Sequence, residues 1–202
     1  VSGITIANKT YDGTKSAVVT GGSLSGVASV DLANVNLTQT GTFASSNVAN
    51  NVSVAMVSTI SGMAAANYAL IQPTGITGNI VQKVLTVGGS TVAANKVYDG
   101  NTVATITGGT LVGVVAADVA NVNLIQAGNF SQSNVGNGIT VTISDSLTGP
   151  AAANYLLTQP ANVTANITPK TLTVSGTTVA NKVYDGTTSA VSYTHLTLPT
   201  KA

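Results

Sequence analysis

The sequence predicts an all-β chain of tandem immunoglobulin-like β-sandwich repeats, each about 87 residues long. Three observations support this fold class. A heptapeptide occurs three times at a nearly constant spacing, apolar residues alternate with Thr and Ser in short runs, and turn residues separate these runs. The 202 residues therefore divide into small domains arranged in series.

The heptapeptide contains Tyr-Asp-Gly and marks equivalent positions in the repeats. From Tyr11 to Tyr98 is 87 residues (98 − 11), and from Tyr98 to Tyr184 is 86 residues (184 − 98). Residues 4–83 align with residues 91–170 without an insertion or deletion. Loops that drift freely change their length, so this constant length indicates that the structure fixes the connections.

Alternating apolar residues predict half-buried antiparallel strands within each repeat. Ile139, Val141 and Ile143 alternate with Thr, for example. Helix signals are weak, because the Ala-rich stretches 114–120 and 151–153 can each form one turn at most. The predicted turns that separate the strands are Gly108-Gly109, Asn137-Gly138 and Gly149-Pro150. We expect about seven short strands in each unit.

The repeat divides the chain into four segments. Residues 1–81 form a first unit that lacks its first strand, residues 82–168 a complete second unit, and residues 169–191 the start of a truncated third. Because Val1 enters a repeat already under way, we expect the chain to be a fragment of a longer protein. Residues 192–202 leave the repeat and are similar to translated sequencing-adapter sequence, so we interpret them as an artefact and expect disorder.

No Gly/Ser linker separates the units. In residues 80–87 the predicted last strand of one unit runs directly into the first strand of the next, and Pro169 fixes its own φ at the following junction. Such a junction limits rotation between neighbours, and each unit is long enough to bury a core of its own. We therefore expect a semi-rigid rod.

The composition excludes several classes of function. Only 6% of the residues are charged, and seven Lys and six Asp carry all of that charge because Arg and Glu are absent. Nucleic acid is not an expected partner, since phosphate binding relies on clustered Lys and Arg. No apolar run approaches the ~20 residues of a membrane helix, so we expect no membrane insertion. The absence of Cys excludes disulfides and thiolate metal sites, and we expect no metal and no cofactor.

The Tyr-Asp-Gly motif predicts a turn. Its Asp can accept a hydrogen bond from the backbone two residues later, its Gly can adopt a positive φ, and its Tyr can bury the ring with the hydroxyl near solvent. Alternatively, Tyr98 and Asp99 face outward and hold a sugar or a metal, although no further acidic ligands lie nearby for calcium. The three copies are Tyr11-Asp12-Gly13, Tyr98-Asp99-Gly100 and Tyr184-Asp185-Gly186.

A second motif pairs Asn with Tyr shortly before a Gln-Pro step. It occurs at Asn67-Tyr68 and at Asn154-Tyr155. We expect a buried Tyr whose hydroxyl bonds back to a nearby turn, as in the tyrosine corner of sandwich domains. The alternative is that Tyr155 stacks against a ligand.

The sequence gives no catalytic residue. Asp31 and Asp118 are carboxylates at equivalent positions, and Asp99 and Asp118 could lie close together in a sandwich. Glycoside hydrolysis usually needs two such carboxyl groups. No His, Arg or Cys of the repeats assists them, so we expect a protein that is not an enzyme.

Taken as a set, these motifs resemble the bacterial YDG repeat domain. The set comprises the heptapeptide, Asn154-Tyr155-x-Leu157-x-Gln159-Pro160 and Asn166-Ile167-Thr168-Pro169-Lys170, and the resemblance covers residues 1–191. The first repeat departs from the pattern at Thr10 and at Val81-Gln82. The family occurs in tandem in large exported surface proteins, including filamentous-haemagglutinin-like adhesins, so the resemblance implies an extracellular or bacterial cell-surface location. It supplies no binding residues.

We expect a non-enzymatic stalk or spacer of an adhesin that presents a distal binding region. Its partners would be neighbouring repeats of the same chain, with a host glycan or protein bound through other regions. The alternative is that each repeat binds a carbohydrate or host protein weakly and the array gains avidity. A polysaccharide-processing enzyme is a third possibility and would need two carboxylates facing each other across a cleft.

Overall fold

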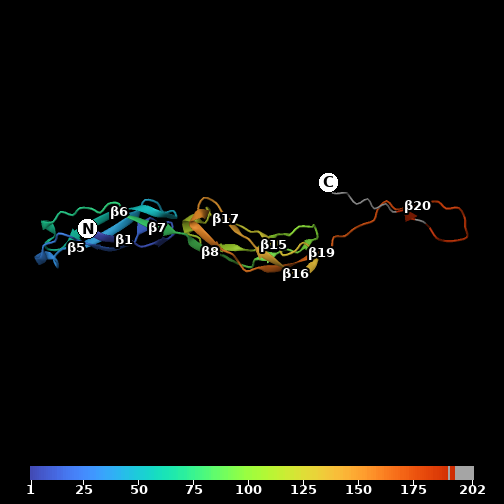
Figure 1. The fold of residues 1–202 in the computed structure, drawn as a ribbon, viewed down its shortest axis with the longest axis horizontal. Helices are drawn as coiled ribbons and strands as arrows, with labels where there is room; N and C mark the ends of the chain where they lie inside the picture. The colour runs from blue at the N-terminus through green and yellow to red at the C-terminus, as the bar shows by residue number, and fades with distance from the viewer. Residues whose placement is uncertain (191, 194–202) are drawn as a thin grey trace.

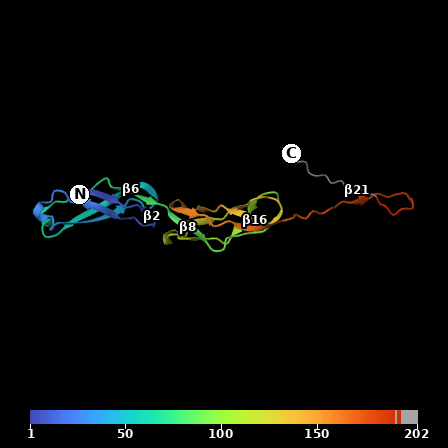
Figure 2. The same ribbon diagram turned by 60° about the horizontal axis from the view of Figure 1, so that its bottom comes forward.

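The computed structural model describes residues 1–190 and 192–193 as an elongated, all-β chain (Figure 1). Two packed bodies lie end to end along the long axis, and both views show the same order (Figure 2). We call residues 1–81 unit one, residues 82–168 unit two and residues 169–190 the third segment. The third segment extends away from unit two at the end opposite unit one.

Unit one contains a five-stranded sheet of order β2-β7-β6-β5-β3 and a two-stranded sheet of β1 and β4. Two single turns of 3-10 helix, η1 and η2, connect strands. The elements are β1 (Ser2–Ile6), β2 (Lys9–Thr10), β3 (Ser16–Ala17), β4 (Val19–Ser23), η1 (Ser29–Asp31), β5 (Asn36–Phe43), β6 (Ala49–Ser61), η2 (Ala65–Asn67) and β7 (Thr77–Val81).

Unit two repeats the five-stranded sheet as β10-β19-β16-β15-β11 and adds a three-stranded sheet, β13-β8-β18. Two strand pairs, β12-β9 and β14-β17, complete it. The elements are β8 (Lys83–Gly88), β9 (Val92–Ala93), β10 (Lys96–Val97), β11 (Val103–Ala104), β12 (Ile106–Thr107), β13 (Thr110–Val112), η3 (Ala116–Asp118), β14 (Asn123–Ile125), β15 (Gly128–Phe130), β16 (Gly136–Ile143), β17 (Ser146–Thr148), η4 (Ala152–Asn154), β18 (Tyr155–Thr158) and β19 (Val163–Thr168).

The two five-stranded sheets agree in register at the 87-residue offset. Lys9 pairs in parallel with Ile80, and Lys96 pairs in parallel with Ile167. The strand that contains the Tyr-Asp-Gly motif's Lys is therefore held against the last strand of its own unit. Parallel pairing here places each motif at the end of a unit where the chain crosses to the next one.

The units differ at the three-stranded sheet. In unit two, β8 lies between β13 and β18, and its Leu85 pairs in parallel with Leu157. In unit one, residues 68–71 are the equivalents of β18 and belong to no strand. Among the described residues, none lies beside them as β8 lies beside β18.

Hydrophobic packing does not follow the unit boundary. One buried cluster combines Phe43 and Ile80 of unit one with Leu85 and Tyr155 of unit two. A second cluster lies inside unit two, around Phe130 and its neighbours. The expectation that each unit buries a separate core is wrong at the junction. Leu85 of β8, the strand that follows Gln82, packs in the same cluster as Phe43 and Ile80 of unit one.

Most predicted turns and helical stretches are confirmed. Gly149-Pro150 follows β17, η3 lies within the Ala-rich stretch 114–120, and η4 overlaps the stretch 151–153. The predicted turn at Asn137-Gly138 is wrong, because both residues lie within β16. Gly138 has a φ of +61° where the register with β19 shifts, so the glycine serves a β-bulge.

The third segment contains one short strand, β20 (Thr178–Val179), which pairs with β21 (Ser192–Tyr193). The expectation of disorder is therefore wrong for residues 192–193, because their backbone pairs with the third segment. Residues 194–202, on which the rest of that expectation falls, lie outside the described residues. Over the part of the chain that the structure describes, no helix is long and apolar enough to cross a membrane.

Candidate functional site: the junction between the units

The Tyr-Asp-Gly turns are closed by an ion pair between Lys and Asp. Lys9 Nζ lies 2.7 Å from Asp12 Oδ2, and the Thr14 backbone N–H donates to Asp12 Oδ1 at 2.8 Å. Gly13 has a φ of +79°, which an L side chain rarely adopts. Equivalent ion pairs and backbone bonds occur at Asp99 and at Asp185. The predicted turn roles of Asp and Gly are confirmed.

Ionisation of the turn's Asp is favoured by its partners. Burial of the Asp12 carboxyl opposes ionisation, but hydrogen bonds from the Lys9 ammonium and from Thr14 outweigh it and lower the pKa of Asp12 to about 2. The Lys96 ammonium likewise lowers the pKa of Asp99. Both carboxylates are charged at neutral pH and already satisfied within their own turns, so neither is free to bind a metal on its own.

The side chain of Tyr11 extends from its turn into unit two. Its side chain is only 4% exposed, and its hydroxyl donates to Asp118 Oδ2 at 2.7 Å. The Tyr155 hydroxyl donates to the same oxygen, also at 2.7 Å. The two rings meet edge to face with their centroids 5.3 Å apart, an arrangement that aromatic pairs favour. A residue of one unit thus completes the core of the next.

The turn around η3 holds the acceptor in place. Asp118 is the last residue of η3 and is 8% exposed, and the Val115 backbone N–H just before η3 donates to the Tyr155 hydroxyl at 3.1 Å. Tyr155 thereby accepts one hydrogen bond and donates another. The predicted burial of Tyr155 is confirmed, but the predicted bond to a nearby turn, as in a tyrosine corner, is wrong, because the partners of the hydroxyl lie 37 and 40 residues earlier in the chain.

Burial makes both hydroxyls hard to ionise. Desolvation, together with the hydrogen bond to Asp118, raises the pKa of Tyr11 to about 12. The same two causes raise the pKa of Tyr155 to about 12. Both phenols are therefore neutral donors at physiological pH, which is the state that a shared carboxylate acceptor requires.

Amide side chains close the rest of the junction. Asn154 Oδ1 accepts from the Val48 backbone N–H at 2.9 Å, and Asn154 Nδ2 donates to Asn47 Oδ1 at 3.3 Å. Gln82 Nε2, in the single residue between β7 and β8, donates to the carbonyls of Ala153 and Tyr155. Together with Tyr11, these contacts tie the connecting residue and both units into one hydrogen-bonded joint.

The other two predicted Tyr residues of the heptapeptides are exposed. Tyr98 is 40% exposed at the far end of unit two, and Tyr184 is 92% exposed in the third segment. The expectation of a buried ring with the hydroxyl near solvent is wrong in every copy, because burial depends on a following unit and Tyr11, which has one, buries its hydroxyl as well. Asp99 lies with Lys96 beside Tyr98, whereas Asp118 lies at the junction, so the structure does not bring these two carboxylates together.

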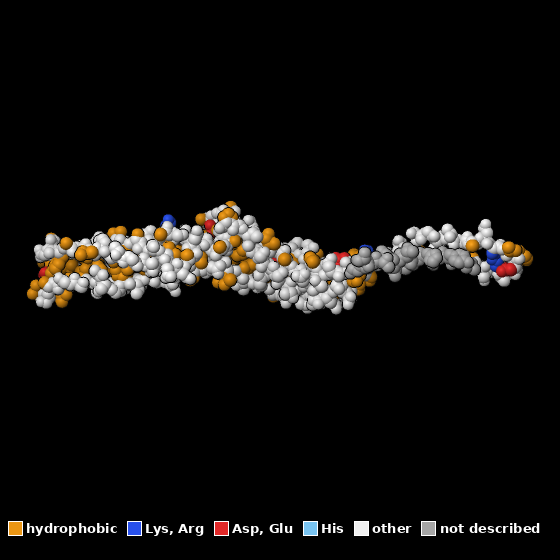
Figure 3. Space-filling model, turned by 45° about the horizontal axis from the view of Figure 1, so that its top comes forward, with side chains coloured by type: hydrophobic (Ala, Val, Ile, Leu, Met, Phe, Trp, Pro, Cys, Tyr) orange, Lys and Arg blue, Asp and Glu red, His pale blue; other side chains and the backbone are white. Residues whose placement is uncertain are grey.

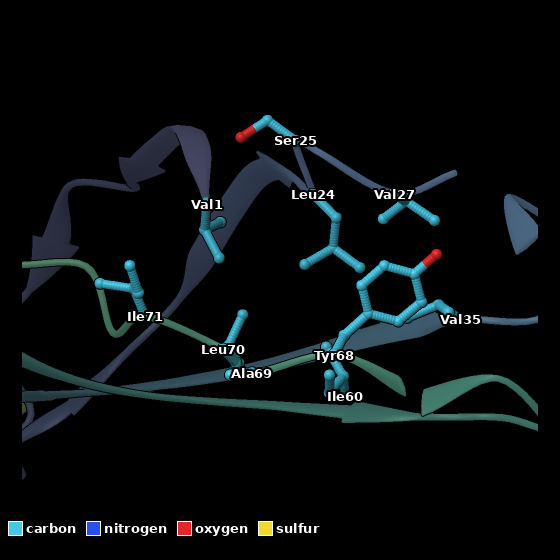
Figure 4. Close-up of a pocket in the computed structure, with 10 residues that line it drawn as sticks. All are labelled: Val1, Leu24, Ser25, Val27, Val35, Ile60, Tyr68, Ala69, Leu70 and Ile71. Carbon is cyan, nitrogen blue, oxygen red and sulfur yellow. The ribbon is translucent and has the colours of Figure 1, made fainter. Parts of the chain in front are cut away.

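The equivalent site in unit one is complete only on one side. The Tyr68 hydroxyl donates to Asp31 Oδ2 at 2.9 Å and accepts from the Ala28 backbone N–H at 3.0 Å, as Tyr155 does in unit two. No second Tyr of the described residues reaches Asp31. Beside Tyr68 lies a pocket (Figure 4), which is lined by Val1, Leu24, Val27, Val35, Ile60 and Leu70 among others.

Sequence reasoning missed that Asp118 is shared between units. The sequence shows that Asp118 and Asp31 occupy equivalent positions in the two repeats, and that Asn and Gln are frequent near the unit ends. Neither signal identified a partner in the next unit.

The Gln-Pro motif has a role that the sequence left open. Gln159 Oε1 accepts from the Asp145 backbone N–H and Gln159 Nε2 donates to the Asp145 carbonyl, both at 2.8 Å. Gln72 makes the same two bonds to the backbone of Ser58.

Within the described residues, no group of three or more His, Cys, Asp or Glu side chains lies close enough together to hold a metal ion. The chemistry of the site is that of a packed joint between repeated β units. The class of protein that the fold and the site define is therefore an all-β tandem-repeat protein whose units share a core at their junction.

The family model described as the YDG domain matches residues 1–76 and 81–163. The chain belongs to the YDG domain family. The two matches correspond to the two units on either side of the Tyr11 joint. No curated protein and no solved structure matches the chain.

Proposed function

We propose that this chain is a structural stalk, a series of stiffly joined β-sandwich units of immunoglobulin-like type, and that it has no catalytic role. The observation that carries the proposal is the burial of Tyr11 of unit one against Asp118 and Tyr155 of unit two. A flexible tether has no use for such a joint, whereas a spacer that must hold its length depends on it.

The joint resists bending through three separate restraints. Tilting the units apart would return the Tyr11 ring to water, at a cost on the order of 2–3 kcal/mol. It would also break the bonds of Asn154 to residues 47 and 48. Only Gln82 separates β7 from β8, so the backbone offers few torsions about which a hinge could turn.

The proposed setting is a large exported bacterial surface protein of the adhesin type, in which these units hold a distal binding region away from the cell. The support for this setting is the resemblance of the repeat motifs to tandem YDG repeats of such proteins. The surface has few charges, and its polar residues are mostly the uncharged Thr, Ser and Asn (Figure 3). Such a surface is compatible with this location.

Small-angle X-ray scattering of the whole chain tests the stalk. We expect the wild type and Tyr98→Ala to give the same extended, rod-like profile, because Tyr98 contacts no following unit. Tyr11→Ala should broaden the distance distribution, since the units can then tilt. A wild-type profile that fits freely hinged units, or one that Tyr11→Ala leaves unchanged, would overturn the proposal.

A second candidate function is weak binding of a carbohydrate or host protein by each unit. It is supported by Tyr98, which is 40% exposed and lines a shallow hollow with Val135, Pro169 and Leu172. Tyr155, the other candidate, is 3% exposed and its hydroxyl is engaged, so its ring is not free to stack. A glycan array that gives no signal, or the same signal with Tyr98→Ala, would remove this candidate.

A further inference from the structure

We propose that unit two opens at a waist inside the repeat, so that the parts of the chain that unfold together are displaced from the sequence repeat. The half of unit two before the waist, the near half, opens together with unit one, and the far half opens alone. The inference concerns local stability and does not depend on the stalk function. The waist comprises residues 89–91, 108–109, 126–127, 144–145 and 159–162.

Strands of unit two are interrupted at the waist. The near half contains β8, β13, β14, β17 and β18, and the far half contains β9, β10, β11, β12, β15, β16 and β19. The interruptions lie at one level, because Gly88 pairs with Thr110 and Ile125 pairs with Ser146 immediately beside them. In Figure 1, β8 and β17 lie toward unit one, whereas β15, β16 and β19 lie toward the third segment. The two halves can therefore separate without breaking a continuous strand.

The waist also separates two hydrophobic clusters. Leu85 and Tyr155 of the near half belong to the cluster that contains Phe43 and Val54 of unit one. Among the described residues, the second cluster draws only on the far half, around Val141. Apolar burial is what a local opening must give up, so the residues of one cluster open together. The near half of unit two is thus coupled to unit one more strongly than to its own far half.

Buried polar groups lie at the waist between the clusters. Gln126 Nε2 and Asp145 Oδ2 are buried and have no hydrogen-bond partner among the described residues. Asp145 is 6% exposed, and the Gln159 side chain binds its backbone N–H and carbonyl. A buried polar group without a partner is costly, and opening at the waist relieves this cost because water reaches the group.

The side chain of Asp145 accounts for one of the interruptions. Asp145 Oδ1 accepts from the Ala127 backbone N–H at 3.1 Å, so a side chain binds a group that a strand would otherwise pair. In unit one the equivalent residue is Ser58, which lies opposite Gln39 in the register of β5 and β6. Both of these strands run through that level without a break. The substitution of Asp for Ser is therefore what distinguishes the waist of unit two here.

Hydrogen exchange of the whole chain, measured by mass spectrometry, tests the inference. Leu85 and Val141 lie in opposite halves of unit two and are both 0% exposed, so Leu85→Ala and Val141→Ala are matched variants. The readouts are the amides of residues 52–54 in β6 and the equivalent residues 139–141 in β16. If the repeat were the unit of opening, Leu85→Ala would accelerate exchange at 139–141 and spare 52–54.

We expect the opposite ranking. Leu85→Ala should accelerate exchange at 52–54 by at least about tenfold and change 139–141 by less than about twofold. Val141→Ala should accelerate exchange at 139–141 and leave 52–54 unchanged. Leu85→Val gives the same ranking with a smaller effect if the Ala variant does not fold. Unchanged exchange at 52–54 in a folded Leu85 variant, or equal acceleration at both places, would overturn the inference.

The role of Asp145 is tested by adding a second substitution to the Leu85 variant. Asp145→Ser should extend the accelerated exchange to 139–141, because the strands can then run through the waist as they do at Ser58. Asp145→Asn retains the acceptor for the Ala127 N–H and should not extend it. Extension in both variants, or in neither, would overturn this role. A rod-like scattering profile is compatible with every one of these results, so the stalk and the waist can fail separately.

Discussion

Tyr11 and Tyr155 are 144 residues apart in sequence (155 − 11), yet their rings touch edge to face and their hydroxyls donate to one carboxylate oxygen of Asp118. One Tyr comes from unit one and the other from unit two. Loss of this contact would therefore show directly that the two units have separated.

Tyr11→Phe should reduce the free energy of unfolding by about 0.5–1.5 kcal/mol. The ring keeps its packing on Tyr155, but one hydrogen bond to Asp118 is lost while the second, from Tyr155, remains. Urea denaturation measures the change. Tyr98→Phe is the matched control and should have no effect, because Tyr98 lies at a unit end that no other unit covers. Equal losses in both variants would contradict the junction role.

Asp118→Ala should be more costly, about 2–4 kcal/mol, because two buried hydroxyls lose their acceptor at once. Asp31→Ala removes the equivalent carboxylate in unit one, where only Tyr68 donates to it and the site is partly open. Its loss should be clearly smaller. Denaturation of the two variants under one condition gives the comparison, and a greater loss for Asp31→Ala would be the opposite of what the shared acceptor implies.

Stability should fall as the pH rises from about 10 to about 12. Both Tyr11 and Tyr155 have pKa values raised to about 12 in the folded chain, above the ordinary value of 10.0. Between these values the unfolded chain releases protons that the folded chain keeps, so the contribution of these phenols is present below pH 10 and is lost through pH 12. Denaturation at stepped alkaline pH measures the slope.

In Tyr11→Phe this alkaline slope should be reduced by roughly half, since one of the two phenols is gone. Tyr98→Phe should leave the slope unchanged and serves as the control. A wild-type chain whose stability is flat across this range would show that the two hydroxyls are not buried donors in solution.

Trypsin should cut the native chain at Lys182 and Lys170 well before Lys96. All of the third segment's residues from Lys170 to Ala190 are exposed, whereas Lys96 pairs in β10 with β19 and its side chain is 16% exposed. Local opening governs cleavage, and β10 must open with its sheet. Mass spectrometry of a short digestion identifies the first cuts. Early cleavage at Lys96 would mean that the Tyr-Asp-Gly turn is a loose loop.

Much of the fold could be read from local pattern. The alternation at Ile139, Val141 and Ile143 predicted a strand that buries one face, and these three side chains are 6%, 0% and 4% exposed. The Asp-Gly step predicted a turn with a positive φ at Gly13. These features depend on neighbours within a few residues, so sequence spacing is enough to specify them.

The candidate site could not be read in the same way. Tyr11, Tyr98 and Tyr184 occupy the same motif, but their exposures are 4%, 40% and 92%. Nothing in the heptapeptide distinguishes them. The difference arises because only Tyr11 has a described following unit that supplies Asp118 and Tyr155.

The sequence by itself determined the period, the strand character, the turn chemistry and the absence of a linker at Gln82, because each is a property of short stretches of chain. Only the tertiary structure decided that the hydrophobic core continues across the unit boundary and that Tyr11 and Tyr155 share Asp118. The physical reason is that burial is a property of surfaces brought together from distant parts of the chain, and a motif gains or loses its partner according to which surface is placed against it.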